Sequence, residues 1–230
     1  MVISQRPKKV VLIVGTDTEV GKTWIAHKLL DIWRELGISV SARKPAQSFC
    51  KGSWPTDADV LAAASGELPE DVCPKSYWYP LEMAPPMAAE ALGLEPPTLA
   101  GLVSSASWPS DVNVGLVESA GGVRSPQAVD GDAVDLARML QPQGIVLVSH
   151  AGLGCINSVR LSHDAIAGIS VEGGEEIPIF TVLNRFETGN DLHRRNLEWL
   201  RERYAIQVRT GLLDDIVALG HELVADVTSG

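Results

Sequence analysis

The sequence is poor in cysteine and in basic residues, and both shortages exclude classes of protein. Its 230 residues include 3 cysteines, Cys50, Cys73 and Cys155, and no two of them form a C-x-x-C pair. A disulfide framework or a cysteine-based zinc site is therefore not expected, and we interpret the cysteines as small buried residues in a reducing cytoplasm. Lys and Arg number 19 against 29 Asp and Glu, a formal net charge of -10. Without a basic patch, we expect no nucleic-acid partner.

Long hydrophobic runs are also missing. Residues 10–14 follow Lys8 and Lys9 as in a signal peptide, but this apolar run is too short and leads into a loop rich in Gly, Thr and Asp. No apolar stretch reaches the roughly 18 residues that cross a bilayer, so we expect no membrane partner. Hydrophobic residues make up 45% of the chain, which is ordinary for a globular protein. We expect residues 1–230 to form a single α/β domain.

Strand and helix patterns alternate along the chain. Residues 10–14 form a continuous apolar run that predicts a buried parallel strand. Apolar residues then recur at helical spacing over 22–36, and Gly37 follows. Further strands are predicted at 38–43, 112–118, 145–149, 177–183 and 206–208, and helices at 57–65, 87–92, 98–107, 130–140, 157–169, 192–204 and the C-terminal end. Such alternation predicts an α/β fold with a doubly wound, mostly parallel sheet.

The link between the first strand and the first helix resembles a phosphate-binding loop. The general pattern is G-x-x-x-x-G-K-[ST], and Thr16 here occupies its first glycine position. Backbone N–H groups and the helix N-terminus can still hold phosphate oxygens, while Lys22 and Thr23 supply an ammonium group and a hydroxyl. The fold is therefore expected to be P-loop NTPase-like. The predicted nucleotide-binding loop is Gly15, Thr16, Asp17, Thr18, Glu19, Val20, Gly21, Lys22 and Thr23.

Four segments together resemble the dethiobiotin synthetase family. The string Gly-Thr-Asp-Thr-Glu-Val-Gly-Lys-Thr at 15–23 is similar to that family's signature, which cobyrinate-type amide synthases share in looser form. Residues 44–48 resemble its K-P-x-Q-[ST], residues 117–122 its V-E-G-A-G-G, and residues 152–157 its G-L-G-x-I-N. The matches run in order from about residue 10 to residue 185, so they cover most of the chain.

The resemblance implies an enzyme that uses ATP and Mg²⁺. It assigns the metal to Thr23, Asp57 and Glu118, the adenine to Asn184, and catalysis to Thr18, Lys22 and Lys44. Asp59 remains an alternative to Asp57, because an Asp at a helix start is often a cap. The resemblance places the substrate against Lys44, Ser48, Glu118, Gly121, Gly122, Gly154, Cys155, Ile156 and Asn157.

The same resemblance implies the reaction and a partner subunit. The substrates would be 7,8-diaminononanoate, CO₂ or bicarbonate, and ATP, joined through a carbamate and a carbamic-phosphoric anhydride. In the family, residues matching 152–157 come from the neighbouring subunit and hold the substrate carboxylate, which implies a homodimer. The five histidines show no metal-like spacing. The six tryptophans are interpreted as packing residues.

Departures from the family pattern keep two rival functions open. Phe49 stands where glycine is usual, Ser119 replaces another glycine, and the loop near residues 208–213 lacks the usual proline. Phe49 above all leaves open a nucleotide-binding paralogue without diamine activity. The other rival is an ATPase switch that positions other proteins, although such switches carry an extra lysine near the start of the loop, where this chain has Asp17 and Glu19. A cobyrinate-type synthetase would need a glutaminase domain, for which the 230 residues leave no room.

Overall fold

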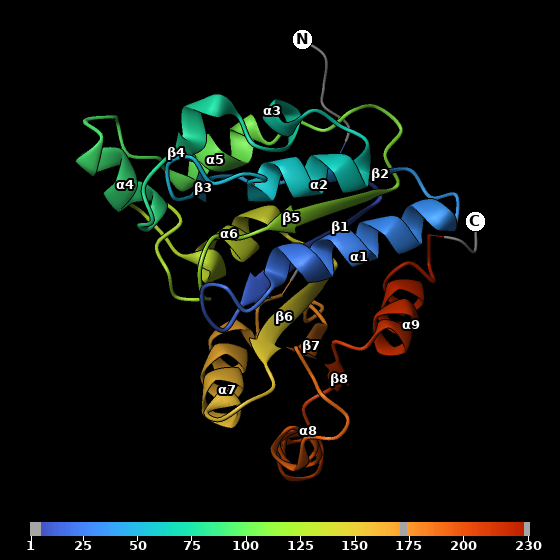
Figure 1. Ribbon diagram of the computed structural model, residues 1–230. Helices are drawn as coiled ribbons and strands as arrows, with labels where there is room; N and C mark the ends of the chain where they lie inside the picture. Colours follow the sequence, from blue (N-terminus) through green and yellow to red (C-terminus); the bar gives the residue numbers. More distant parts are fainter. Residues whose placement is uncertain (1–5, 171–173, 228–230) are drawn as a thin grey trace.

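The computed structural model describes residues 6–170 and 174–227. At its centre lies a parallel sheet in the order β2-β5-β1-β6-β7-β8 (Figure 1). The strands are β1 (Lys9–Gly15), β2 (Val40–Arg43), β5 (Val114–Glu118), β6 (Gly144–His150), β7 (Ile179–Asn184) and β8 (Val208–Thr210). From β1 the chain builds first toward β2 and β5 and then toward β6, β7 and β8, which is the doubly wound arrangement that the sequence predicted.

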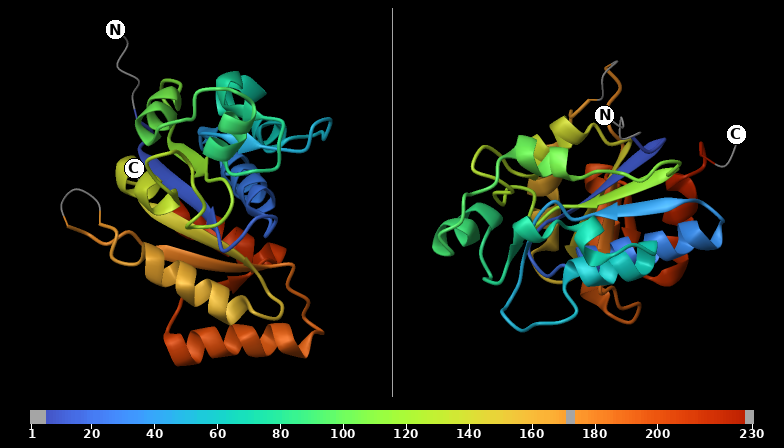
Figure 2. Two further views of the ribbon diagram at one scale, coloured as in Figure 1. Left: turned by 90° about the vertical axis from the view of Figure 1, so that its left-hand side faces the viewer. Right: turned by 90° about the horizontal axis from the view of Figure 1, so that it is seen from above.

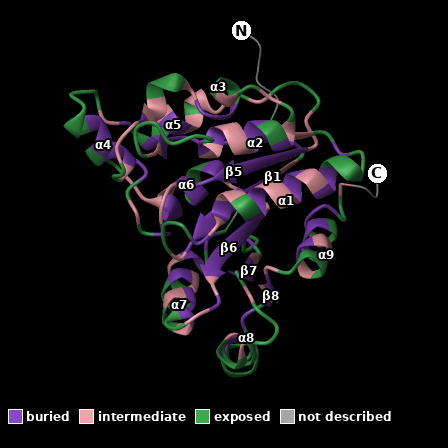
Figure 3. Ribbon diagram, viewed as in Figure 1, coloured by how far each residue is buried: buried purple, intermediate pink, exposed green. Residues whose placement is uncertain are grey.

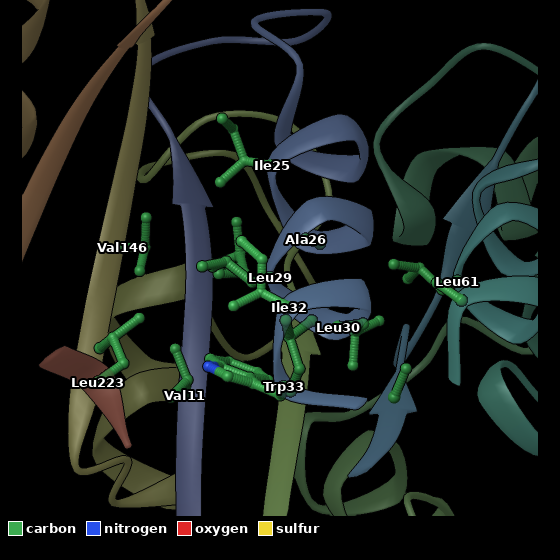
Figure 4. Close-up of a cluster of buried hydrophobic side chains, with 14 of the residues drawn as sticks. Val11, Ile25, Ala26, Leu29, Leu30, Ile32, Trp33, Leu61, Val146 and Leu223 are labelled. Atoms are coloured by element: carbon green, nitrogen blue, oxygen red, sulfur yellow. The ribbon is translucent and has the colours of Figure 1, made fainter. Parts of the chain in front are cut away.

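Helices cover both faces of the sheet, which explains why β1 is apolar over residues 10–14. Val11 and Ile13 pack into one hydrophobic cluster, whereas Val10 and Leu12 pack into another on the opposite face. The first cluster is covered by α1 (Lys22–Glu35), α2 (Asp57–Ser65) and α9 (Leu213–Leu223). Figure 4 shows side chains of α1 directed at the strands, and the Trp33 indole donates a hydrogen bond to the Gly220 carbonyl of α9 (2.9 Å).

The second face carries helices from the middle of the chain. They are α5 (Leu99–Ser105) and α6 (Ala133–Leu140), with residues of α4 (Pro85–Ala91) and the end of α7 (Cys155–Ile166) in the same cluster. A third, smaller cluster joins α7 and α8 (Asp191–Tyr204) to β7 and β8. Figure 3 shows the strands of the sheet almost wholly buried and the outer surfaces of the helices exposed.

The segment between α2 and α5 holds more structure than its sequence pattern predicted. It contains α3 (Pro69–Val72), the 3₁₀ turn η1 (Lys75–Tyr77) and β4 (Trp78–Tyr79), which pairs in parallel with β3 (Gln47–Ser48). The helix expected at residues 87–92 begins earlier, because Pro85 and Pro86 occupy its first turn. Elements of two to four residues are too short to show a periodicity, so hydrophobic patterns could not reveal them.

Several predicted boundaries were also wrong, for identifiable reasons. The helix expected from residue 130 begins at Ala133, because the Asp132 carboxylate caps it by accepting from the Val134 and Asp135 amides. The helix expected from residue 157 already begins at Cys155, after Gly154 with a φ of 90°. The strand expected at 206–208 instead runs over residues 208–210, where Val208 pairs with Thr181.

Two expectations drawn from residue type alone need correction. Cys73 and Cys155 are buried as expected, but Cys50 is exposed. Trp33 is a packing residue at 0% exposure, whereas Trp24, Trp54 and Trp199 are exposed, Trp54 most of all at 82%. Cys50 and Trp54 lie in the loop between β3 and α2, which extends away from the sheet in the views of Figure 2. Residue type predicts burial only where the surrounding chain supplies a core.

Parallel pairing brings the polar strand ends to one edge of the sheet. Ile13 of β1 is level with Glu118 of β5, and His150 of β6 is level with Asn184 of β7. The loop after β1 and Lys44 after β2 lie at this same carboxyl edge. In open parallel sheets ligands bind at such an edge, beside the point where the strand order reverses. None of the described helices combines the length and the apolar character needed to span a membrane.

Candidate functional site

The loop from β1 to α1 needs glycine at two positions. A Cβ atom on Gly15 would lie 2.8 Å from the Asp17 carbonyl oxygen, and one on Gly21 would lie 2.1 Å from the Asn184 amide nitrogen. Gly21 also has a φ of 94°, which side chains rarely adopt. The Thr16 amide donates to the Val148 carbonyl (2.9 Å), so the loop begins by following β6. These constraints hold the loop in a close backbone turn at the N-terminus of α1.

The Lys22 side chain folds back over this loop. Its ammonium group donates to the Asp17 carbonyl oxygen (3.1 Å), and the residue is 6% exposed. Burial, together with the neighbouring Lys44 ammonium group, lowers the pKa of Lys22 to about 8. A cation held in this way at a helix N-terminus is suited to binding phosphate oxygens.

Four side chains, three from helices or strands and one from the loop after β2, meet beside the P-loop. The Lys44 ammonium group lies 2.8 Å from Asp57 Oδ2 and 2.6 Å from Glu118 Oε1. The Thr23 hydroxyl lies 2.9 Å from Asp57 Oδ1 and 2.9 Å from Glu118 Oε1. Asp57 begins α2, Thr23 lies in the first turn of α1, and Glu118 ends β5. The structure therefore joins sequence-predicted residues that are up to 95 positions apart.

The charges of this cluster shift one another. The Lys44 ammonium group holds the pKa of Asp57 below its ordinary value. Burial disfavours the charged form of Lys44, but the Asp57 and Glu118 carboxylates outweigh it and raise the Lys44 pKa. Glu118 is 0% exposed, and this burial raises its pKa although Lys44 opposes the shift. Lys44 is therefore the most firmly charged member of the cluster.

The structure separates Asp57 from Asp59. The Asp59 carboxylate accepts from the Thr56 amide (2.8 Å) and from the Thr56 hydroxyl (2.7 Å). The Thr56 hydroxyl in turn accepts from the Asp59 amide, which completes a capping box at the start of α2. Asp57 faces Lys44 and Thr23 instead. Of the two carboxylates, only Asp57 lies where a cation beside Thr23 could meet it.

The donor set of Thr23, Asp57 and Glu118 fits a magnesium ion. Mg²⁺ takes oxygen ligands and is usually held by one or two carboxylates together with phosphate oxygens and water. The second carboxylate oxygen of Glu118, Oε2, is buried and has no hydrogen-bond partner among the described residues. A cation would satisfy that oxygen. Within the described ranges no group of three or more His, Cys, Asp or Glu residues forms a metal cage, so phosphate oxygens would have to complete the coordination.

A cavity of about 750 Å³ opens over this cluster. Predicted site residues that line it are Thr18, Glu19, Gly21, Lys22, Thr23, Lys44, Ser48, Asp57, Glu118 and Gly121. Phe49, Met83 and Pro85 supply apolar lining, and the Phe49 ring meets Trp78 edge to face at 6.2 Å between centroids. The cavity therefore combines a charged floor with an apolar wall, as a site for a substrate with an alkyl chain would.

Other predicted residues lie away from this cavity. Asn184 is 6% exposed, and its side-chain amide donates to the Val20 carbonyl oxygen (2.9 Å) of the P-loop. Gly154, Cys155, Ile156 and Asn157 begin α7 on the other side of the P-loop strand and, in the described part of the chain, do not line the cavity. Cys155 is buried there, and its thiol contacts the Ala151 carbonyl oxygen. The resemblance assigned these residues to the substrate site of the neighbouring subunit, and within one described chain they do not line the cavity that contains Lys44.

Sequence reasoning missed several residues at the site. Glu82 and Arg185 line the cavity, and Arg185 donates to the Glu19 carbonyl oxygen (3.1 Å). Ser125 also lines it, and Gln127 lies buried behind the loop that follows β5. Arg185 could have been suspected because it follows Asn184 at the end of a strand. Gln127 gave no signal, since it lies in an irregular segment outside every quoted motif.

Comparison with known proteins adds relatives over most of the chain. A family model described as an AAA domain matches residues 9–190. The ATP-dependent dethiobiotin synthetase of Anaeromyxobacter dehalogenans is 35% identical over 220 residues, which is 90% of this chain and 96% of that protein. The enzyme of the same name from Xanthomonas oryzae pv. oryzae is 34% identical over 202 residues, covering 84% of this chain and 86% of its own.

Solved structures support the fold. The signal recognition particle receptor FtsY from Elizabethkingia anophelis aligns with a TM-score of 0.54 at 16% identity, over 96% of this chain and 65% of the receptor. A plasmid partition protein from Borrelia burgdorferi aligns with a TM-score of 0.50 at 10% identity, over 97% of this chain and 99% of that protein. These structural similarities, at such low identity, concern the architecture alone.

Proposed function

Because the chain belongs to the dethiobiotin synthetase family, we propose that its cavity carries out ATP-dependent dethiobiotin synthesis in biotin biosynthesis. The substrates are 7,8-diaminononanoate, CO₂ or bicarbonate, and ATP. The observation that carries the proposal is the meeting of Thr23, Lys44, Asp57 and Glu118 beside the P-loop, at the floor of a cavity with an apolar wall. The reaction is that of a cyclo-ligase.

ATP binds along the P-loop in this proposal. Backbone N–H groups of residues 15–23 surround the phosphates, and the buried Lys22 ammonium group contacts the β- and γ-phosphates. Thr23, Asp57 and Glu118 hold Mg²⁺, which when bound draws charge from the phosphate oxygens. Asn184 keeps its donor on Val20, which leaves its side-chain carbonyl oxygen to accept from the amino group of adenine.

The diamine binds where Lys44 and Ser48 face the cavity. One amine adds to CO₂ and loses a proton, which gives a carbamate anion beside the Lys44 ammonium group. A carbamate oxygen then attacks the γ-phosphorus, the bond to ADP breaks, and a carbamic-phosphoric anhydride results. The second amine attacks its carbonyl carbon, the ureido ring closes, and phosphate leaves. Lys44 offsets the charge of the carbamate and of the transferring phosphoryl group, while Thr18 and Lys22 hold the phosphate in place.

The active protein is a homodimer in this proposal. The start of α7, at Gly154, Cys155, Ile156 and Asn157, is a helix N-terminus, which is a place that suits a carboxylate. Because these residues do not line the chain's own cavity, they bind the substrate carboxylate of the partner subunit's site in this proposal. Leu153, just before this helix, is 86% exposed, as a residue at an interface between subunits would be in a single chain.

We propose that residues 1–230 form one domain, that the protein acts in the cytoplasm, and that it has neither a nucleic-acid nor a membrane partner. The described chain offers no membrane-spanning helix, and its net charge of -10 disfavours contact with phosphate backbones.

The test is ADP release from purified protein with ATP, Mg²⁺ and bicarbonate, with and without 7,8-diaminononanoate. We expect release that depends on the diamine, with dethiobiotin as the product. ATP binding without diamine-dependent release would contradict the proposed substrate. That result would favour the second candidate, a nucleotide-binding paralogue. The observation behind this candidate is the Phe49 ring on the cavity wall, at a position where glycine is usual in the family.

A further inference from the structure

We propose that Gln127 is a positioning residue, one that holds the loop after β5 in the shape that the diamine substrate requires. The inference rests on the proposed function, because it concerns the same cavity. The loop comprises residues 119–122 and is called the β5 loop below. Ala120 and Gly121 of this loop line the cavity. Gln127 itself is 3% exposed and lies behind the loop.

Both polar atoms of the Gln127 side-chain amide bind the backbone of Ala120 in the β5 loop. Its Oε1 accepts from the Ala120 amide (2.8 Å), and its Nε2 donates to the Ala120 carbonyl oxygen (2.7 Å). The same nitrogen also donates to the Ser125 carbonyl oxygen (3.0 Å). One side chain thereby replaces the pair of hydrogen bonds that a neighbouring strand would supply. Both of these hydrogen bonds of the Ala120 backbone would therefore be lost with one side chain.

The other hydrogen bonds of the β5 loop lie at its two ends. The Ser119 amide donates to the Ile13 carbonyl oxygen (3.0 Å), and at Gly122 the amide donates to the Ser125 hydroxyl (2.9 Å) while the carbonyl oxygen accepts from the Ser125 amide (3.0 Å). Between these ends Gly121 has a φ of 62°, and two consecutive glycines leave the backbone with many accessible conformations. By holding Ala120 in place, Gln127 limits the backbone conformations that the two glycines would otherwise allow in the free enzyme.

The shape of the β5 loop matters because it touches the P-loop and carries the site. A Cβ atom on Gly122 would lie 3.2 Å from the Thr16 carbonyl oxygen. The Lys44 ammonium group lies 3.4 Å from the Ser119 carbonyl oxygen and also donates to Glu118 Oε1. A displacement of Ala120 would therefore alter the position of Lys44, the lysine that faces the carbamate in the proposed function. Phosphates, in contrast, are held by the P-loop's own backbone and by Lys22, so nucleotide binding should depend much less on Gln127.

Another glutamine provides a matched control at the opposite end of the sheet. The Oε1 of Gln143 accepts from the Val10 amide (2.8 Å), and its Nε2 donates to the Gln141 carbonyl oxygen (2.9 Å). It braces backbone as Gln127 does, but before β6 begins, far from the carboxyl edge. Methionine has nearly the length of glutamine and cannot make either set of hydrogen bonds. The variants compared are Gln127→Met and Gln143→Met, each as the full-length protein.

Steady-state kinetics of diamine-dependent ADP release are measured first on the unaltered protein. For Gln127→Met we expect kcat/KM for 7,8-diaminononanoate to fall by about 10-fold or more, because small misplacements of reactants are costly. The dissociation constant of a non-hydrolysable ATP analogue should change by less than about 2-fold, since its phosphates are held by the P-loop backbone. Gln143→Met should change neither quantity, although both variants lose stability.

Backbone amide hydrogen exchange supplies a readout independent of turnover. Exchange in a peptide covering the β5 loop should become faster in Gln127→Met and stay unchanged in Gln143→Met. If Gln127→Met does not fold, Gln127→Asn keeps the amide but is one methylene shorter. It should shift the kinetics in the same direction by a smaller factor.

The outcomes separate this inference from the function on which it rests. An unaltered protein without diamine-dependent release contradicts the proposed function. Release in the unaltered protein together with an unchanged kcat/KM in Gln127→Met overturns the positioning role alone. Equal losses of analogue binding and of kcat/KM, or equal kinetic losses in the two methionine variants, also overturn it, because Gln127 would then be only a structural residue.

Discussion

Lys44 and Lys22 both face the cavity, but their surroundings differ at the scale of single residues. Lys44 is 2% exposed and contacts Asp57 and the fully buried Glu118. Lys22 is likewise buried, yet its one short contact is a carbonyl oxygen of its own loop. An uncompensated buried charge destabilises a fold more than a lost hydrogen bond does. The two lysines should therefore give different results when they are removed.

We expect Lys22→Ala and Lys44→Ala both to abolish turnover, with kcat reduced by about 100-fold or more as for other lost charge stabilisation. Lys22→Ala should unfold near the temperature of the unaltered protein. Lys44→Ala should lose about 3–5 kcal/mol of unfolding free energy, because Glu118 stays buried without its cation. The measurements are kcat and thermal unfolding. As a control, the double variant that combines Lys44→Met with Glu118→Gln should recover stability but not activity. Near-normal turnover in either lysine variant would contradict these roles.

Asp57 and Asp59 form a second informative pair, since they are neighbours on α2 with different partners. We expect Asp57→Asn to weaken binding of Mn²⁺ in the presence of an ATP analogue by about 10-fold or more. Asp59→Asn should leave that binding unchanged and cost about 1 kcal/mol of stability, because it disturbs the capping box. Electron paramagnetic resonance of Mn²⁺ and urea unfolding measure the two effects. Equal weakening of Mn²⁺ binding by both substitutions would show that Asp57 is no ligand.

At the scale of elements, the edge strand β2 is closed by a carboxylate. Glu67 accepts from the Ser41 hydroxyl (2.6 Å) and the Ala42 amide (2.8 Å), and it pairs with the Arg43 guanidinium group (2.8 Å). Glu67 thus satisfies an exposed strand edge that would otherwise be open to pairing. Burial alone would raise the Glu67 pKa, but Arg43 and these hydrogen bonds hold it below the model-compound value of 4.5.

This lowered pKa makes the stability of the β2 edge depend on pH. Glu67→Gln should cost about 2 kcal/mol at neutral pH, because Arg43 loses its partner in a buried place. A depressed carboxyl pKa stabilises the fold fully above the unfolded pKa, and the stabilisation is lost as the pH falls through the folded pKa. The difference between the two proteins should therefore be constant above about pH 5 and shrink at lower pH. Urea unfolding from neutral to acidic pH measures it; a pH-independent difference would exclude the ion pair as its cause.

At the scale of the whole molecule, the proposed homodimer would complete each site only when two chains meet. The P-loop lines one chain's own cavity whereas the start of α7 does not, and the exposed side chains of α7 include Leu161 at 65%. Each site would then take its phosphate residues from one subunit and its carboxylate residues from the other. Such sharing can be tested without a structure of the dimer.

We expect two inactive variants to restore activity when they are mixed. Lys22→Ala disables the phosphate side, and Asn157→Glu places a negative charge where the substrate carboxylate would bind. After unfolding and refolding together, half of the dimers should be mixed and each should contain one intact site, so about a quarter of the normal activity should return. Refolding each variant alone is the control. No recovery, with dimers shown by sedimentation, would mean that each chain contains its whole site.

The predicted elements show where sequence patterns are informative. Long amphipathic or apolar segments such as α1 and β1 were predicted to within one or two residues, because their periodicity spans several turns or pleats. The short pair β3 and β4 was missed, and the helix before β6 was begun too early, at Asp130 rather than Ala133. The pairing of β3 with β4 joins segments that are distant in the sequence, whereas the Asp132 cap fixes the start of α6 and leaves Asp130 to accept from the distant Leu99 amide.

The sequence by itself determined the P-loop, because residues 15–23 are contiguous and their conformation follows from two glycines and a helix start. It also determined the alternating architecture and the relatives to which the chain is similar. Only the tertiary structure decided which polar residues meet. Lys44 and Glu118 are 74 positions apart, and Asp57 rather than Asp59 joins them because the capping box turns Asp59 away. The tertiary structure also revealed the Gln127 brace, because the path of the irregular segment after β5, which shows no periodic pattern, brings the side chain against the Ala120 backbone seven residues earlier.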